Sequence, residues 1–318
     1  MTSPQLPPDK VQRIRGDLLR WFRDVQRDLP WRRTRDPYAI LVSEVMLQQT
    51  QVDRVLPYYA RFLERFPTAQ ALAEAPVAEV IKLWSGLGYN RRAVNLQRTA
   101  QVVVAEHGGQ FPSDPVALRK LPGLGPYTAG AVAAFAFERD VVFLDTNMRR
   151  VITRLVFGAD SVPEADVLAA AQDLLPPGHG WEWNQALIEF GALQCTARRP
   201  ACIGCPLSDQ CAAFPQIQTS LIEARTRKRP AERFETSSRY YRGRIVERLR
   251  ELPAGADQGV PLATLGSELR EDFSESDLPW LVGLVQGLQR DGLAAIAEDR
   301  PGYDENPDLT LESRVRLP

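Results

Sequence analysis

Residues 118–137, LRKLPGLGPYTAGAVAAFAF, decide the fold of this chain. A helix is expected to end at Leu121, and Gly123 and Gly125 then let the backbone approach another group closely. An alanine-rich helix starts near Tyr127, and the exposed N–H groups of its first turn favour an anion. The pattern predicts a helix-hairpin-helix element, which grips a DNA phosphate without reading the base sequence. The alternative is a helical corner with no binding role.

The rest of the chain before residue 215 also reads as helices. Apolar residues recur at helical spacing from Ile14 to Val25, and no strand-rich stretch occurs in this region. We expect a disordered N-terminus at residues 1–10 and an all-α region at 11–215. Residues 216–239 read as a charged linker. Residues 240–318 contain three helical stretches and a hairpin pattern, which predicts a small winged-helix-like α+β domain.

Charge is unevenly distributed along the chain. Residues 251–318 carry fourteen acidic and five basic side chains, whereas residues 1–250 carry 34 basic and 26 acidic ones. The first part is therefore the one expected to meet a polyanion. The third helical stretch of the C-terminal domain has only Arg290 as a basic residue. This favours packing, or binding of an unknown partner, over insertion into a DNA groove.

Several function classes fit the composition poorly. The longest apolar run, AGAVAAFAF at 129–137, is too short to span a membrane. The first residues, MTSPQLPPDK, do not read as a signal peptide, so we expect a cytoplasmic protein, nucleoid-associated if bacterial. Only His107 and His179 are available for histidine chemistry, and no clustered carboxylate motif would hold the two metals of a nuclease.

All cysteines of the chain lie in one short loop, at Cys195, Cys202, Cys205 and Cys211. Two disulfides would suit a short secreted chain, and structural zinc usually takes two close cysteine pairs. One close pair with wider flanking gaps instead favours a [4Fe–4S] cluster held by four thiolates. Arg198 and Arg199 make the loop basic, as expected for a segment that faces an anion.

Two carboxylates occupy unusual positions. Glu44 lies on an apolar helix face between Val42 and Leu47, where a carboxylate is costly unless it is paired or used. Asp145 directly precedes a helix that starts near Thr146, which is an ordinary capping position. The local patterns leave a salt-bridged structural glutamate and a simple helix cap open.

A set of segments occurs in a recognisable order: LPWRRTRDPY, SEVMLQQTQV, LWSGLGYNRRAVNL, LPGLGPYTAGAV, LDTNMRRV, WNQALIEFGALQC and the cysteine loop. Together they resemble the helix-hairpin-helix DNA glycosylases with an iron–sulfur loop, and more narrowly the adenine DNA glycosylase (MutY-type) branch. The resemblance covers residues 11–215 and implies a two-lobed all-α fold. It also implies a monomer that acts on double-stranded DNA and hydrolyses the N-glycosidic bond of adenine mispaired with 8-oxoguanine or guanine.

The resemblance assigns the chemistry to residues far from the cysteines. Tyr127 stands where the endonuclease III branch has a lysine and cannot form a Schiff base, which implies a monofunctional enzyme. Glu44 is implied as the general acid that protonates adenine at N7, favoured by its apolar surroundings. Asp145 would stabilise the oxocarbenium-like sugar, directly or through a covalent intermediate, and a helix N-terminus would keep it ionised. Tyr127 and Asn147 would support the transition state and position water.

The same resemblance implies the binding residues. The adenine pocket would be formed by Trp31, Arg32, Leu47, Val52 and Gln185. Gln48 and Tyr89 would wedge into the duplex, Gly123 and Gly125 would form the hairpin, and the cluster loop would contact phosphates. The cluster itself is implied to be structural or redox-sensing rather than the hydrolytic catalyst.

The chain departs from the family pattern in three places. Thr146 replaces the glycine of the common LDGN segment, and Asn90 stands where a second tyrosine is common. Most members end in a Nudix-like domain that recognises 8-oxoguanine, whereas residues 240–318 are shorter and look like a winged helix, so that recognition would rest more on the N-terminal region.

Two other functions remain open. One is a glycosylase of the same fold for thymine or uracil opposite guanine, which SEVMLQQTQV with Glu44 argues against. The other is a non-catalytic iron–sulfur DNA-binding protein, which would have no use for both Glu44 and Asp145.

Overall fold

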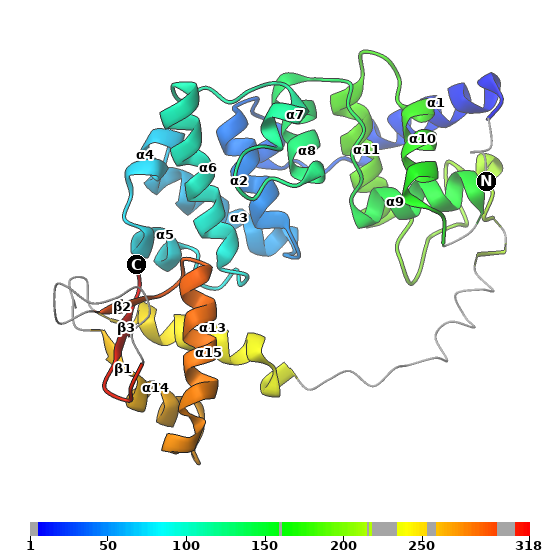
Figure 1. Ribbon diagram of the computed structural model, residues 1–318. Coiled ribbons are helices and arrows are strands. Elements are labelled where there is room, and N and C mark those ends of the chain that lie inside the picture. Colours follow the sequence, from blue (N-terminus) through cyan, green and yellow to red (C-terminus); the bar gives the residue numbers. More distant parts are fainter. Residues whose placement is uncertain (1–5, 159–160, 215, 218–233, 253–258, 298–308) are drawn as a thin grey trace. The chain divides into compact units, whose positions relative to one another are not determined.

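The computed structural model describes residues 6–158, 161–214, 216–217, 234–252, 259–297 and 309–318. The chain forms two compact units, each built from two separate stretches (Figure 1). The first unit contains Met1–Glu44 and Phe111–Arg229, and the second contains Val45–Gln110 and Pro230–Pro318. This division agrees with the two-lobed, mainly helical fold that was expected. Within the described ranges, no helix combines the length and the apolar character needed to cross a membrane.

In the described residues of the first unit, all regular secondary structure is helical. Its elements are α1 (Pro8–Val25), η1 (Pro30–Arg32), the start of α2 (Pro37–Leu47), α7 (Pro115–Leu118), α8 (Pro126–Phe137), α9 (Thr146–Ile152), the π-helical turn η2 (Thr153–Phe157), α10 (Glu164–Leu174), α11 (Gly180–Leu193) and η3 (Ser208–Gln210). Helix α1 buries the predicted apolar stripe from Ile14 to Phe22, whereas Val25, the last residue of that pattern, is 40% exposed. It already begins at Pro8, because proline is well suited to a first helical turn, so the expectation of disorder through residue 10 is wrong for residues 8–10.

The predicted helix-hairpin-helix element is present in this unit as α7 and α8. Helix α7 ends at Leu118 rather than at the expected Leu121. Residues 119–121 form tighter turns, with the Leu121 N–H donating to the Leu118 carbonyl at 3.1 Å, and Pro122 has no N–H to continue them. Gly123 has a φ of +76°, which favours glycine, and Gly125 is the N-cap of α8.

The second unit combines helices with a small sheet. Its elements are the end of α2, α3 (Val52–Arg65), α4 (Ala69–Glu74), α5 (Val77–Leu83), α6 (Arg91–His107), η4 (Phe234–Thr236), α13 (Ser238–Arg250), β1 (Val260–Pro261), α14 (Leu262–Leu269), η5 (Glu275–Asp277), α15 (Leu278–Arg290), β2 (Ala295–Ala297) and β3 (Arg314–Arg316). The antiparallel strand order is β1-β3-β2, with Val260 and Ile296 both paired to Val315. The winged-helix prediction is confirmed, and a third strand joins the predicted hairpin.

The C-terminal helices pack on the helices of the second unit that precede them in the chain. One hydrophobic cluster contains Ile81 of α5 and Val94 of α6 together with Leu249 of α13 and Leu284 of α15. Arg250 adds polar contacts, because its Nε donates to the Ile81 carbonyl at 3.2 Å and its Nη2 to the Asn90 Oδ1 at 2.8 Å. The packing role expected for the C-terminal domain is therefore observed.

Candidate active site and iron–sulfur loop

Glu44 is a buried carboxylate in the part of α2 that belongs to the first unit, with only 5% of its surface exposed. Burial raises its pKa to about 7, and the negative charge of Asp145 acts in the same direction. A hydrogen bond from Tyr127 and the charge of Arg32 lower the pKa but do not compensate for the burial. The raised pKa allows Glu44 to carry a proton near neutral pH, which suits a group that donates a proton.

Tyr127 lies in the first turn of α8, where its hydroxyl hydrogen-bonds the Glu44 carboxyl. Burial and the nearby carboxylates Glu44 and Asp145 raise its pKa well above the usual value, so it remains a neutral donor. Its ring packs edge-to-face on Phe143 with 5.4 Å between ring centroids. Gly130 makes room for that contact, since a Cβ there would lie 2.6 Å from the Phe143 Cβ.

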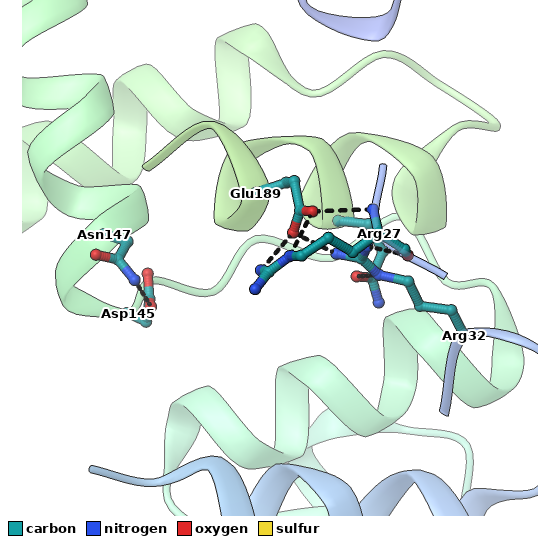
Figure 2. A network of polar contacts seen from close by, with 6 residues as sticks. Arg27, Arg32, Asp145, Asn147 and Glu189 are labelled. Atoms are coloured by element: carbon teal, nitrogen blue, oxygen red, sulfur yellow. Dashed lines mark hydrogen bonds and ion pairs between the residues drawn. The ribbon is translucent and has the colours of Figure 1, made fainter. Parts of the chain in front are cut away.

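Asp145 caps helix α9, as its position in the sequence suggested. Its Oδ1 accepts from the Met148 backbone N–H at 2.6 Å. Its Oδ2 accepts from the Asn147 Nδ2 at 3.2 Å, a contact seen in Figure 2. These donors lower its pKa, but burial outweighs them and the net shift is upward. The helix N-terminus thus acts in the expected direction but does not decide the pKa of Asp145. The same carboxylate caps a helix and acts electrostatically on Glu44, so the two interpretations are compatible.

A second polar network joins α11 to the segment after α1 (Figure 2). Glu189 is fully buried and accepts from Arg27 Nη2 at 2.7 Å and from Arg32 Nη2 at 2.9 Å. Burial alone would raise the pKa of Glu189, but the hydrogen bonds from the two arginines bring it to about 2. Arg32 also donates through Nε to the Gln185 Oε1 at 2.8 Å, which leaves the amide NH₂ of Gln185 as its remaining donor.

Glu189 and Arg27 were not predicted as site residues from the sequence. The position of Glu189 inside the apolar segment WNQALIEFGAL could have indicated it, just as Glu44 was indicated by its place on an apolar helix face. The partners of Glu189 could not be identified from the sequence, because Arg27 lies 162 residues away in the chain.

The structure brings together Glu44, Tyr127, Asp145 and Asn147 in the first unit, and Arg32 with Gln185 in the same unit. Trp31 is also in this unit and is buried. Gly123 and Gly125 of the hairpin lie in the first unit as well, whereas the remaining expected binding residues belong to the second unit: Leu47, Gln48, Val52 and Tyr89.

In the second unit, Arg92 organises the two segments that carry the expected wedge residues. Its Nη1 donates to the carbonyls of Val45 and Gln48, both at 2.7 Å, and its Nη2 donates to the Gly88 carbonyl at 3.1 Å. Tyr89 follows directly with a φ of +46° and is 41% exposed. A non-glycine residue held at positive φ is strained, and such positions cluster at functional sites. Arg92 was not predicted as a positioning residue.

The four cysteines line one pocket in the first unit, of about 40 Å³. The four thiols face the same pocket, as expected for a [4Fe–4S] cluster in which each iron takes one thiolate. Burial raises the pKa of Cys205 to about 11, so bound iron would be needed to keep it a thiolate at neutral pH.

Two arginines, one in helix α9 and one in the turn η2 that follows it, tie the cysteine loop to this part of the first unit. Arg154 donates to the Thr196 carbonyl at 2.9 Å, and its Nη1 lies 3.8 Å from the Cys195 Sγ. Arg150 donates to the Cys195 carbonyl at 2.8 Å and to the Asn147 Oδ1 at 2.9 Å. Arg198 and Arg199 are exposed on the loop, as expected for side chains that face an anion.

Comparison with known proteins gives consistent matches. The HhH-GPD superfamily base excision DNA repair protein family matches residues 42–177, and the iron–sulfur binding domain of endonuclease III matches residues 195–211. An adenine DNA glycosylase of Mycolicibacterium smegmatis is 44% identical, over 74% of this chain and 80% of its own length. One from Mycobacterium tuberculosis is 42% identical, over 85% and 84%. The human adenine DNA glycosylase is 42% identical over 68% of this chain, which spans 42% of that longer protein.

Solved structures show the same fold. A thermostable thymine-DNA glycosylase superposes with a TM-score of 0.62 at 32% identity, covering 65% of this chain and 98% of its own. A trapped endonuclease III–DNA covalent intermediate gives a TM-score of 0.58 at 26% identity, covering 67% and 100%.

The family expected from the motifs is confirmed by relatives that this chain covers over most of their length. The chain belongs to the adenine DNA glycosylases and is a base excision repair enzyme of helix-hairpin-helix fold that carries a [4Fe–4S] cluster.

Proposed function

We propose that this enzyme removes adenine mispaired with 8-oxoguanine or guanine, by hydrolysis and without lyase activity. The observation that carries the proposal is the buried Glu44, whose pKa is about 7, hydrogen-bonded to Tyr127 and close enough to Asp145 to be influenced by its charge. Enzymes that cleave glycosidic bonds commonly use two catalytic carboxyl groups in different environments. Tyr127 provides no amine, so the lyase route through a Schiff base is not available at this position.

In the proposed reaction, Glu44 donates its proton to N7 of the extruded adenine. The bond between C1′ and N9 then breaks, and its electron pair leaves with the base. The carboxylate of Asp145 stabilises the positive charge that develops on the sugar. A water molecule positioned with the help of Asn147 adds its hydroxyl to C1′, and its remaining proton returns to a carboxylate, which restores the starting state.

The base would be read by Arg32 and Gln185, with stacking on Trp31 and apolar contacts from Leu47 and Val52. The Glu189 network supports this role, because it holds the Arg32 guanidinium and thereby orients the Gln185 amide. On this proposal Glu189 and Arg27 are positioning residues.

The remaining assignments concern DNA and the cluster. Gln48 and Tyr89 would wedge into the duplex, while the Gly123–Gly125 hairpin, Arg198 and Arg199 would contact phosphates. Each of the four cysteines would supply one thiolate to the cluster, which braces this loop. We further propose that residues 11–215 and 240–318 are the two domains of a cytoplasmic monomer working on DNA, nucleoid-associated if the source is a bacterium.

One assay separates the proposed activity from the alternatives. The protein is incubated with duplexes carrying adenine opposite 8-oxoguanine, adenine opposite guanine, thymine opposite guanine and uracil opposite guanine, with and without alkali. Strand breaks at adenine that require alkali are expected. Breaks without alkali would contradict the absence of lyase activity. Breaks at thymine or uracil would favour a glycosylase of the same fold for another base, and thymine is the base named for one similar structure.

Two variants test the assigned chemistry. Glu44→Gln and Asp145→Asn should each abolish adenine release while retaining binding to the mispaired duplex. Full activity in either variant would overturn its role. Metal analysis of the purified protein should show iron, and zinc in place of iron would contradict the cluster assignment.

A further inference from the structure

The second unit contains a pocket that the proposed reaction does not use. It has a volume of about 560 Å³ and is formed by the start of α6 together with α13 and the end of α15. Its aromatic and charged lining residues are Tyr89, Arg91, Arg92, Arg239, Arg242 and Asp291. Four guanidinium groups therefore meet one carboxylate in this pocket. This local excess of positive charge contrasts with the acidic composition of residues 251–318.

Most of these cations are already occupied. Asp291 pairs with Arg242 and, at 3.3 Å, with Arg91, while Arg92 is turned toward the backbone carbonyls described above. Arg239 is different. Its guanidinium lies 4.3 Å from the centre of the Tyr89 ring and 5.7 Å from that of Phe234, and no carboxylate of the described residues pairs with it.

This arrangement leaves the donors of Arg239 available. Stacking on aromatic rings uses the face of a guanidinium, so its N–H groups, which lie in the plane, remain free to bind an anion. Oxygen anions with several acceptors, such as phosphates, match that planar fork. Tyr89, on which Arg239 stacks, is itself partly exposed, as a side chain that meets DNA must be.

We propose that Arg239 binds a backbone phosphate of the duplex beside the Tyr89 wedge. The C-terminal domain is then part of the DNA-binding surface, through the first turn of α13. Its third helix, α15, is not the DNA-contacting element. The inference rests on the proposed function only in taking duplex DNA as the ligand.

The role of Arg239 is tested by DNA binding in the full-length protein with its cluster. The dissociation constant of Arg239→Ala is measured by fluorescence anisotropy on a fully paired duplex over a range of salt concentrations. Loss of one phosphate contact should weaken binding about tenfold at low salt and reduce the slope of log K against log salt by about 0.9. The weakening should be similar on a duplex with a mispaired adenine, because a phosphate contact carries no sequence information.

Arg248→Ala is the matched control, because it removes the same charge from the same helix. Arg248 pairs with Glu268 at 2.9 Å and does not line the pocket, so its removal should change the salt slope little. Equal effects of the two variants would overturn the proposal, since only the net charge of α13 would then matter. An unchanged salt slope in Arg239→Ala would also overturn it. Because a fully paired duplex is not a substrate, these outcomes do not depend on whether the enzyme releases adenine.

Discussion

Removing the hydroxyl of Tyr127 should move the pH dependence of adenine release upward. In Tyr127→Phe the ring can keep its edge-to-face contact with Phe143, so the change is confined to one hydrogen bond with Glu44. That bond lowers the pKa of Glu44, against a burial effect that raises it. Without the hydroxyl, burial acts with less opposition.

The size of the shift follows from the energy of such a bond. A hydrogen bond to a charged group contributes about 1.5–3 kcal/mol, and one pKa unit corresponds to about 1.4 kcal/mol. The pKa of Glu44, about 7 in the native site, should therefore rise by about one to two units. Since the protonated form is the donor, the rate should fall with increasing pH above this pKa, and the falling limb should shift upward by the same amount.

Single-turnover rates of adenine release, measured across about pH 5 to 10, would show the shift. Tyr241→Phe in the C-terminal domain makes the same chemical change away from Glu44, and its falling limb should remain near that of the native enzyme. A limb that stays in place or moves downward in Tyr127→Phe would refute the reasoning, because the hydroxyl would then not stabilise the ionised carboxylate.

Three further changes have expected outcomes. Because the pKa of Glu44 is raised in the folded state, its ionisation costs stability as pH rises from about 4.5 through about 7. In urea denaturation, Glu44→Gln should therefore raise the unfolding free energy by up to about 3 kcal/mol at pH 8 and by little at pH 4. A gain that does not depend on pH would contradict this linkage. Gly130→Ala should destabilise the fold by about 1–3 kcal/mol, because the added Cβ would clash with Phe143. Gly16→Ala in α1 is the control and should not destabilise it, since a Cβ there would meet no atom within 4 Å. Equal effects of the two variants would exclude the packing argument. Glu189→Gln should lower the melting temperature, because Arg27 and Arg32 would lose the buried carboxylate with which they pair, at a cost of about 3–5 kcal/mol. An unchanged melting temperature would contradict this and would show that water takes the place of the carboxylate.

Features that depend on neighbouring residues could be predicted from the sequence. The apolar pattern from Ile14 to Val25 predicted α1, and the two glycines after Leu121 predicted the hairpin before α8. The spacing of the cysteines predicted the cluster loop, because a metal centre formed within one loop is encoded in consecutive residues. Departures at element ends, such as Leu118 as the last residue of α7, reflect turn geometry that propensity describes only roughly.

The order of residues alone was therefore enough to predict the helices, the family and the chemical types of the site residues. Which groups share an environment follows from the way the chain folds. It brings Glu44 of α2 to the hydroxyl of Tyr127, and it buries Asp145 so that its pKa shifts upward despite the helix N-terminus. It also pairs Glu189 with Arg27 and stacks Arg239 on Tyr89. Burial and charge pairing join residues far apart in the chain, and their effects depend on distances that no local pattern records.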